Sequence, residues 1–251
     1  MNVHAYLEEG ARRHPDKTAL VCGGERLSYR EVHARARGFA NGLLGDGLLP
    51  RDRVAFCLDN SPSVVTGLFG TLMAGGVFTV LHPTLKAAQL AERLRDAGAR
   101  VLVTDRRHAE TLAALADGLD GVRCLTVGGD PGVPASPLRV SSFESMHRTE
   151  AVSPEPETRE GDLAALIYTS STTGRAKGVM LSHRNLDAAS EAITSYLENR
   201  SEDVLLGVLP LAFGYGLSQL LTAFRVGATL VLERSFLYPY PVIEKLVQER
   251  V

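Results

Sequence analysis

Short apolar runs alternate with longer amphipathic stretches along most of the chain. The short runs are rich in β-branched residues and end at turn residues, as strands do, whereas the longer stretches repeat their apolar positions with helical spacing. The predicted strands are Thr18–Cys22, Arg53–Leu58, Val77–Leu81, Arg100–Thr104, Val122–Val127, Leu163–Tyr168, Asp203–Leu209 and Ala228–Leu232. The predicted helices are Val3–Arg13, Tyr29–Leu44, Pro62–Ala74, Ala87–Ala97, His108–Ala116, Arg184–Glu198, Leu217–Val226 and Pro241–Arg250.

This alternation over short connections predicts an α/β fold of stacked, mostly parallel sheets with flanking helices. Near-continuous apolar strands, such as LAALIY at 163–168 and VLLGVLP at 204–210, fit sheets that are covered on both faces.

Residues 128–162 differ from the rest of the chain in composition. They contain five prolines, many acidic residues and few apolar ones, which is typical of a surface connection. We therefore predict a first α/β subdomain at residues 1–160 and a second one at residues 161–251, which opens with the strand Leu163–Tyr168.

Composition and charge narrow the class of protein. The chain has 251 residues, is 45% hydrophobic and has a net charge of −2, so nothing in it predicts a nucleic-acid partner. Its three cysteines lie far apart in or beside apolar runs and are expected to be buried, reduced thiols. The N-terminus has no apolar signal segment, and the long uncharged stretches at 64–81 and 204–224 are interrupted by glycine or proline. We expect no membrane span and a cytoplasmic location.

The sequence YTSSTTGRAKGVM, residues 168–180, carries the clearest chemical signal. Hydroxyl groups and backbone amides can surround an anion, Gly174 and Gly178 allow unusual backbone conformations, and Arg175 and Lys177 supply positive charge. It is not a Walker A loop, because Lys177 is followed by glycine. The residues alone fit a phosphate-binding loop and a solvated surface loop equally well.

The longer stretch YTSSTTGRAKGVMLSHRN resembles the phosphate-binding motif of the AMP-forming adenylation superfamily. That superfamily contains acyl- and aryl-CoA ligases, peptide-synthetase adenylation domains and luciferases. Three further segments resemble its motifs: LSYREV at 27–32, MAGGVFTVLHP at 73–83 and VLPLAFGYGL at 208–217. The chain departs from the family pattern at Ser171, where glycine is usual, and at Ala176, where proline is usual. The resemblance implies the N-terminal part of the adenylate-forming enzyme fold.

The resemblance also implies a reaction. Such enzymes react a carboxylic acid with ATP to give an acyl-adenylate, with Mg²⁺ screening the negative charges, and then transfer the acyl group to a thiol. The acceptor would be coenzyme A or the phosphopantetheine of a carrier protein. The residues implied to bind the ATP phosphates are Thr169, Ser170, Ser171, Thr172, Thr173, Gly174 and Lys177.

The segment resembling the family's acyl pocket indicates the substrate class. The implied pocket residues are Phe213, Gly214, Tyr215 and Gly216. Phe213 stands where many fatty-acid and cinnamate ligases have histidine. Benzoate-type ligases, like this chain, carry phenylalanine there. Residues 212–222 contain no acidic side chain to pair with an ammonium group, so an aryl or other apolar acid is favoured over an amino acid. Amino-acid adenylation stays an alternative, and so does simple core packing of Phe213 and Tyr215.

Family members are considerably longer than this chain. The motif that stacks on adenine, the aspartate that holds the ribose and the lysine that bridges the reacting oxygens have no counterpart here, so we name no catalytic residue. We expect an N-terminal portion of a ligase with weak or no activity alone. The alternative is a non-catalytic binding or interaction module. His183 is expected to pack or cap the start of a helix rather than to contact substrate.

Overall fold

The computed structural model contains a seven-stranded sheet and a four-stranded sheet. It describes residues 1–115, 118–119, 121–129, 138–150, 156–169, 177–234 and 239–251. The order of the larger sheet is β7-β6-β5-β3-β4-β8-β9, and all neighbours are parallel except the antiparallel pair β8–β9. Its strands are β3 (Arg53–Cys57), β4 (Val77–Leu81), β5 (Ala99–Thr104), β6 (Arg123–Thr126), β7 (Arg139–Ser142), β8 (Leu163–Thr169) and β9 (Lys177–Ser182).

The smaller sheet combines two strands from the N-terminal 28 residues with two strands from residues 204–232. Its order is β10-β11-β1-β2, where β1 is parallel to β11 and antiparallel to β2. Its strands are β1 (Thr18–Cys22), β2 (Glu25–Ser28), β10 (Val204–Gly207) and β11 (Thr229–Leu232). Leu20 is in register with Leu230, so residues far apart in the sequence share one sheet.

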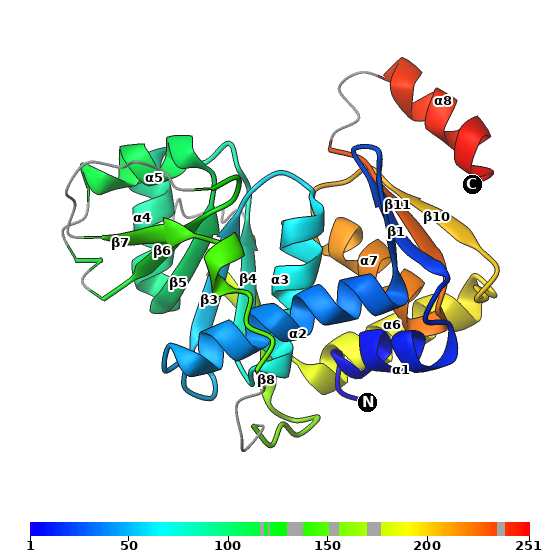
Figure 1. Cartoon of the computed structure of the whole chain (residues 1–251), viewed down its shortest axis with the longest axis horizontal. Helices are drawn as coiled ribbons and strands as arrows, with labels where there is room; N and C mark the ends of the chain where they lie inside the picture. Colours follow the sequence, from blue (N-terminus) through cyan, green and yellow to red (C-terminus); the bar gives the residue numbers. More distant parts are fainter. Residues whose placement is uncertain (116–117, 120, 130–137, 151–155, 170–176, 235–238) are drawn as a thin grey trace.

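Helices form layers on and between the sheets (Figure 1). They are α1 (Ala5–Arg13), α2 (Tyr29–Gly45), α3 (Pro62–Met73), α4 (Ala87–Ala97), α5 (Arg106–Ala113), α6 (His183–Tyr196), α7 (Gly214–Val226) and α8 (Pro239–Glu249), with a short 3₁₀ helix at Glu144–Met146. Helices α4 and α5 pack on one face of the seven-stranded sheet. Helices α1, α2, α3 and α7 contribute to the core on its other face, which is shared with the four-stranded sheet.

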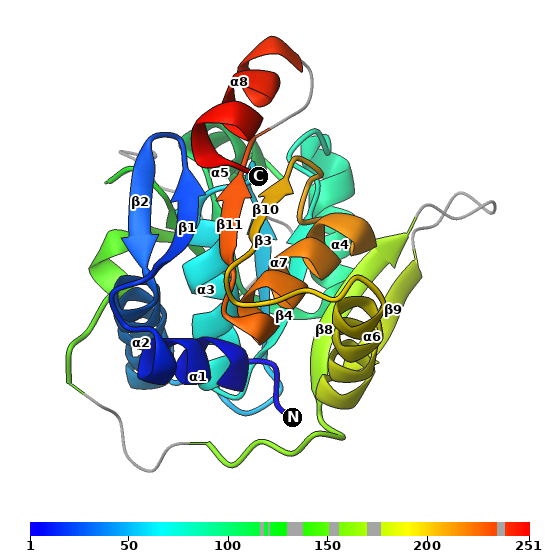
Figure 2. The ribbon, with the colours of Figure 1, turned by 90° about the vertical axis from the view of Figure 1, so that its right-hand side faces the viewer.

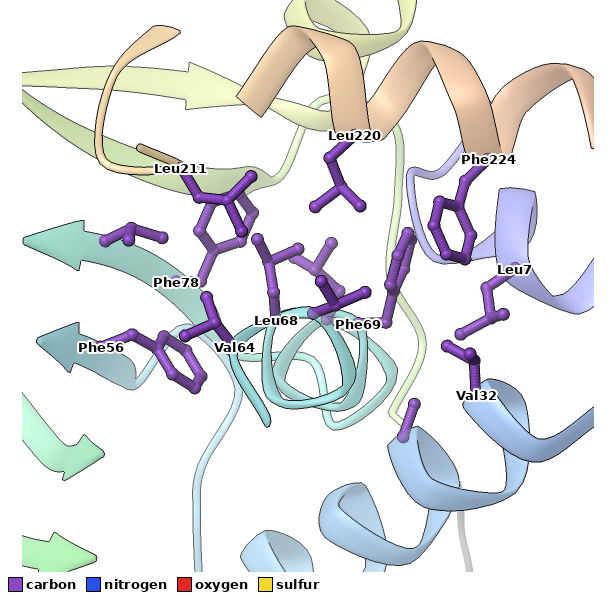
Figure 3. Packing of buried hydrophobic residues seen from close by; sticks show 14 of the residues in the cluster. Leu7, Val32, Phe56, Val64, Leu68, Phe69, Phe78, Leu211, Leu220 and Phe224 are labelled. Atoms are coloured by element: carbon purple, nitrogen blue, oxygen red, sulfur yellow. The ribbon is translucent and has the colours of Figure 1, made fainter. Parts of the chain in front are cut away.

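Helix α3 lies in the centre of this shared core. Its first turn is stabilised by Pro62 and by Ser61, whose hydroxyl accepts a hydrogen bond from the backbone of Val64. Ten of its residues are buried, and Figure 3 shows Leu68 and Phe69 among side chains from the seven-stranded sheet and from α7. The absence of any charged residue in α3 fits a helix that is surrounded by core on all sides.

The predicted fold class is confirmed, and each predicted helix and strand has a counterpart. Three strands were not predicted: β2, β7 and β9. Both sheets combine strands from either side of residue 160, since β8 and β9 extend the larger sheet while β1 and β2 join β11. The division into 1–160 and 161–251 therefore does not coincide with a division between sheets, and it stays a prediction.

Two other expectations concern the cysteines and the membrane. Cys22, Cys57 and Cys124 are free and buried, and burial raises the pKa of the Cys57 thiol to about 12. They are therefore unreactive core side chains, as expected. Within the part of the chain that the structure describes, no helix has the length and apolarity needed to cross a bilayer.

Candidate functional site

The predicted phosphate-binding residues lie at the end of the β8–β9 hairpin. Thr169 is the last residue of β8, Lys177 is the first of β9, and the two form the terminal register pair. Both side chains are exposed. Ser170, Ser171, Thr172, Thr173 and Gly174 lie outside the described residues. The structure therefore places a hydroxyl group and an ammonium group on the strands that flank this stretch.

Tyr168, the residue before Thr169, faces helix α4. Its hydroxyl group donates a hydrogen bond to Asp96 over 2.6 Å, and the guanidinium of Arg93 lies 5.7 Å from the centre of its ring. Burial and, next, the bond to Asp96 raise the pKa of Tyr168 above its usual range. The phenol thus stays protonated and fixes the end of β8 against α4.

His82 lies at the same edge of the sheet as the hairpin end and contacts the predicted acyl-pocket segment. His82 directly follows β4, and β4 is the parallel neighbour of β8, so His82 and Thr169 lie at the same carboxyl edge of the sheet. The ring of His82 packs 5.4 Å from the ring of Phe213 at an angle of 39°. Ligands of open α/β sheets commonly bind at such an edge.

Phe213 and Tyr215 are not part of the core. Phe213 is 53% exposed and Tyr215 is 79% exposed, in contrast to the buried Leu211, Ala212 and Leu217 beside them. This excludes simple core packing of the two rings in the described structure. Gly216 lies so close to the preceding turn that a side chain would not fit: a Cβ atom there would lie 2.4 Å from the carbonyl oxygen of Pro210. The first turn of α7 therefore packs directly on the backbone of the preceding turn.

Sequence reasoning missed Asn60, which contacts the pocket segment. Its side chain is 3% exposed, and its carboxamide donates to the carbonyl oxygen of Leu209 and accepts from the backbone N–H of Leu211. The only signal in the sequence was a polar residue placed just after a predicted strand and before the Ser-Pro that starts a helix. Its partners lie about 150 positions away, so no local pattern could identify them.

The comparison with protein families decides the classification. The family model described as AMP-binding enzyme matches residues 7–251. The chain belongs to the AMP-binding enzyme family. This confirms the family to which the phosphate-loop motif pointed.

Individual AMP-binding relatives support the same conclusion. The chain is 36% identical to a feruloyl-CoA synthase of Amycolatopsis over 96% of this chain and 45% of that protein. It is 33% identical to the phosphinothricin tripeptide synthetase PhsC of Streptomyces viridochromogenes over 99% of this chain and 22% of that protein. A benzoate CoA ligase from Burkholderia xenovorans has a TM-score of 0.85 at 25% identity, covering 100% of this chain and 49% of that one. The chain thus spans less than half the length of each of these AMP-binding proteins.

His183 has the structural role that was expected of it in this AMP-binding chain. It begins α6, is 1% exposed and accepts a hydrogen bond at Nδ1 from the backbone N–H of Val3. Burial and, next, the nearby His4 lower the pKa of His183 to about 4. Its imidazole is therefore neutral near pH 7 and joins α6 to the N-terminal segment.

No described part of this AMP-binding chain presents a cluster of three or more His, Cys, Asp or Glu side chains able to hold a metal ion. Mg²⁺ in nucleotide-dependent enzymes is commonly held by one or two carboxylates together with the substrate's phosphates. The hairpin end, with exposed Thr169 and Lys177, fits the phosphates themselves through a hydroxyl group and a cation.

Proposed function

We propose that this chain supplies the ATP-phosphate-binding and acid-binding residues of an enzyme that activates a carboxylic acid as its acyl-adenylate. The observation that carries the proposal is the shared carboxyl edge of β4 and β8. There, Thr169 is the last residue of β8, while His82 directly follows β4 and packs on Phe213. Under this proposal, the phosphate-binding and acid-binding groups would share one edge of the sheet.

Lys177 and the hydroxyl side chains would bind ATP. In the reaction, a carboxylate oxygen of the acid bonds to the α-phosphorus as the bond to pyrophosphate breaks. Two anions must approach each other, so positive charge near the phosphates lowers the barrier. Lys177 would bind phosphate oxygens as a fixed cation and take no proton. Ser170, Ser171, Thr172, Thr173 and Gly174 are proposed to complete the phosphate site with Thr169, and bound Mg²⁺ would add further charge screening.

The acid is proposed to be aryl or otherwise apolar. Phe213 and Tyr215 present exposed rings, His82 packs beside the first, and residues 212–222 contain no carboxylate that could pair with an ammonium group. The names of two relatives, feruloyl-CoA synthase and benzoate CoA ligase, support this class. The similarity to a tripeptide synthetase keeps amino-acid adenylation as the alternative.

The acyl group would then pass to a thiol, either of coenzyme A or of phosphopantetheine on a carrier protein. Both acceptors have support among the relatives, which include CoA ligases and peptide synthetases. A reaction between soluble substrates suits a cytoplasmic enzyme, and we propose that location.

We also propose that further polypeptide covers part of this surface in the active enzyme. Several large apolar side chains beyond residue 177 are exposed: Val179, Met180, Tyr196, Leu197, Leu209, Ile243 and Val247. A contiguous apolar patch commonly marks an interaction surface, and the adjacent exposed residues Val179 and Met180 of β9 are the proposed centre of one. The relatives are more than twice as long as the matched region. We propose that residues corresponding to their remaining part cover these exposed side chains. A non-catalytic binding module is the competing proposal.

Acid-dependent exchange of pyrophosphate into ATP tests the proposed activity. The chain would be assayed with aryl, fatty and amino acids, alone and together with the portion of the Amycolatopsis feruloyl-CoA synthase that it does not span. We expect exchange with aryl acids, stronger in the combined sample. Exchange with amino acids only would support the alternative substrate class. No exchange in either sample, from a chain shown to be folded, would favour the non-catalytic module.

Replacing Lys177 by alanine tests the phosphate-binding role. Loss of a charge-assisted hydrogen bond to phosphate is expected to lower the exchange rate by about 10- to 100-fold. The matched control is Lys245→Ala, which removes the same charge from helix α8. Equal rates for Lys177→Ala and the unaltered chain would contradict the role of Lys177.

A further inference from the structure

The side chain of Asn60 connects three strand ends that belong to both sheets. Asn60 lies between β3 and α3 and is 3% exposed. Its Nδ2 group donates to the carbonyl oxygen of Leu209 over 3.0 Å and to that of Glu233 over 2.9 Å, while its Oδ1 accepts from the backbone N–H of Leu211 over 3.0 Å. Leu209 follows β10 and Glu233 follows β11, so one carboxamide joins the larger sheet to two neighbouring strands of the smaller one.

The bonds to Leu209 and Leu211 fix the turn that leads into the acyl-pocket segment. Pro210 lies between the two bonded residues, and its carbonyl oxygen accepts from the N–H of Phe213 over 3.0 Å. Gly216 packs on the same turn, since an added Cβ would approach the carbonyl oxygens of both Pro210 and Leu209 to within 2.6 Å. The positions of Phe213 and the first turn of α7 are therefore set by a turn whose two sides are bonded to Asn60.

The chemistry of this position requires an amide. The surroundings offer two acceptors and one donor, and an asparagine side chain supplies two N–H donors and an oxygen acceptor. Aspartate would keep the acceptor but bring a buried negative charge against two carbonyl oxygens, which is strongly unfavourable. Alanine would leave the N–H of Leu211 and both carbonyl oxygens without this partner.

We infer that Asn60 is a positioning residue for the acid-binding pocket: it fixes the 209–213 turn, and through that turn the rings that contact the acid. This inference rests on the proposed acid activation. A displacement of the pocket should weaken acid binding selectively, because Lys177 and the hairpin that would bind ATP are attached to β8 and not to this turn.

The first experiment needs no activity. Amide hydrogen exchange of the unaltered chain should show Leu211 protected, and Asn60→Ala should reduce its protection about tenfold or more while β3 and β4 keep theirs. The matched control is Asn41→Ala: Asn41 is also buried, at 5% exposed, and its Nδ2 donates to the carbonyl oxygen of Arg148 instead. An unprotected Leu211 in the unaltered chain, or unchanged protection in Asn60→Ala, would overturn the inference.

The second experiment separates positioning from general stability. In the pyrophosphate-exchange assay, Asn60→Ala should raise the KM for the acid about tenfold or more and leave the KM for ATP within about twofold, whereas Asn41→Ala should change neither. Equal rises in both KM values, or a rise in the control as well, would reduce Asn60 to a structural residue. If the unaltered chain exchanges with no acid, the proposed function fails, and the hydrogen-exchange result still decides whether Asn60 fixes the turn.

Discussion

Helix α3 and strand β9 are both rich in apolar residues, yet only α3 is buried. Ten residues of α3 are buried between the two sheets, whereas the first four residues of β9, from Lys177 to Met180, are exposed (Figure 2). β9 is an edge strand, and Met180 is 69% exposed. The comparison teaches that apolar pattern alone does not imply burial: α3 has partners on every side, and β9 has a partner along one edge.

Helix α6 combines the two environments on opposite faces. His183, Leu186, Ser190 and Thr194 are buried, while Arg184 at its start and Tyr196 at its end are exposed. Burial here follows the side of the element that is covered. Substitutions should therefore have effects that decrease from the buried residues of α3 to the exposed residues of β9.

The largest effect is expected in α3. Leu68 is fully buried among side chains that include Phe78 and Leu211 (Figure 3), so Leu68→Ala should lower the free energy of unfolding by about 2–5 kcal/mol through lost burial and a cavity. Urea denaturation followed by circular dichroism measures this change. A loss below about 1 kcal/mol would mean that α3 is not the centre of the core.

An intermediate effect is expected at His183 and depends on pH. The pKa of His183 is about 4 in the folded chain and about 6.5 when unfolded, so between these values the unfolded chain binds a proton that the folded chain does not. Stability should therefore fall as the pH is lowered from about 6.5 to about 4, by about 2 kcal/mol at pH 5.

His183→Asn, which can keep an acceptor for the N–H of Val3 but does not titrate, should lack this loss. Urea midpoints of both proteins at pH 7 and pH 5 make the comparison. A parallel fall in the two proteins would assign the pH dependence to another histidine, such as His33, whose pKa is lowered by burial and, next, by the nearby Arg37.

The smallest effect is expected in β9. Met180→Ser should change the free energy of unfolding by less than about 0.5 kcal/mol, because the side chain is already largely in water. The same substitution should reduce any stimulation of exchange by the complementing portion of the relative, since it removes part of the proposed contact surface. A large loss of stability in Met180→Ser would show that β9 is covered within this chain.

How much of the fold the sequence predicts depends on the range of the interactions. Strands such as β4 and helices such as α4 have the predicted bounds, because their periodicity and end signals are local. The sequence of β9 resembles a loop, since it begins with Lys177 and Gly178, and only its antiparallel pairing with β8 makes it a strand. The other two unpredicted strands also lack a local strand signal: β2 is short and follows Gly-Gly, and β7 lies within the proline-rich connection.

The candidate site shows the same limit. The sequence indicated Lys177 through the phosphate-binding motif and Phe213 through the acyl-pocket segment, because each is a continuous stretch that resembles a family pattern. Nothing local indicated that His82 would pack on Phe213, or that Asn60 would bond to Leu209, Leu211 and Glu233. These contacts arise only when the two sheets come together.

The pairing of β1 with β11 has a consequence for synthesis on the ribosome. The β1–β2 hairpin emerges early, but its parallel partner is not available until residue 232 has been made. An isolated two-stranded hairpin is marginally stable, and an unpaired apolar strand edge promotes aggregation. The nascent chain should therefore keep one edge of TALVC unpaired until residue 232 has been made. Deletion of trigger-factor-type chaperones is expected to lower the soluble yield.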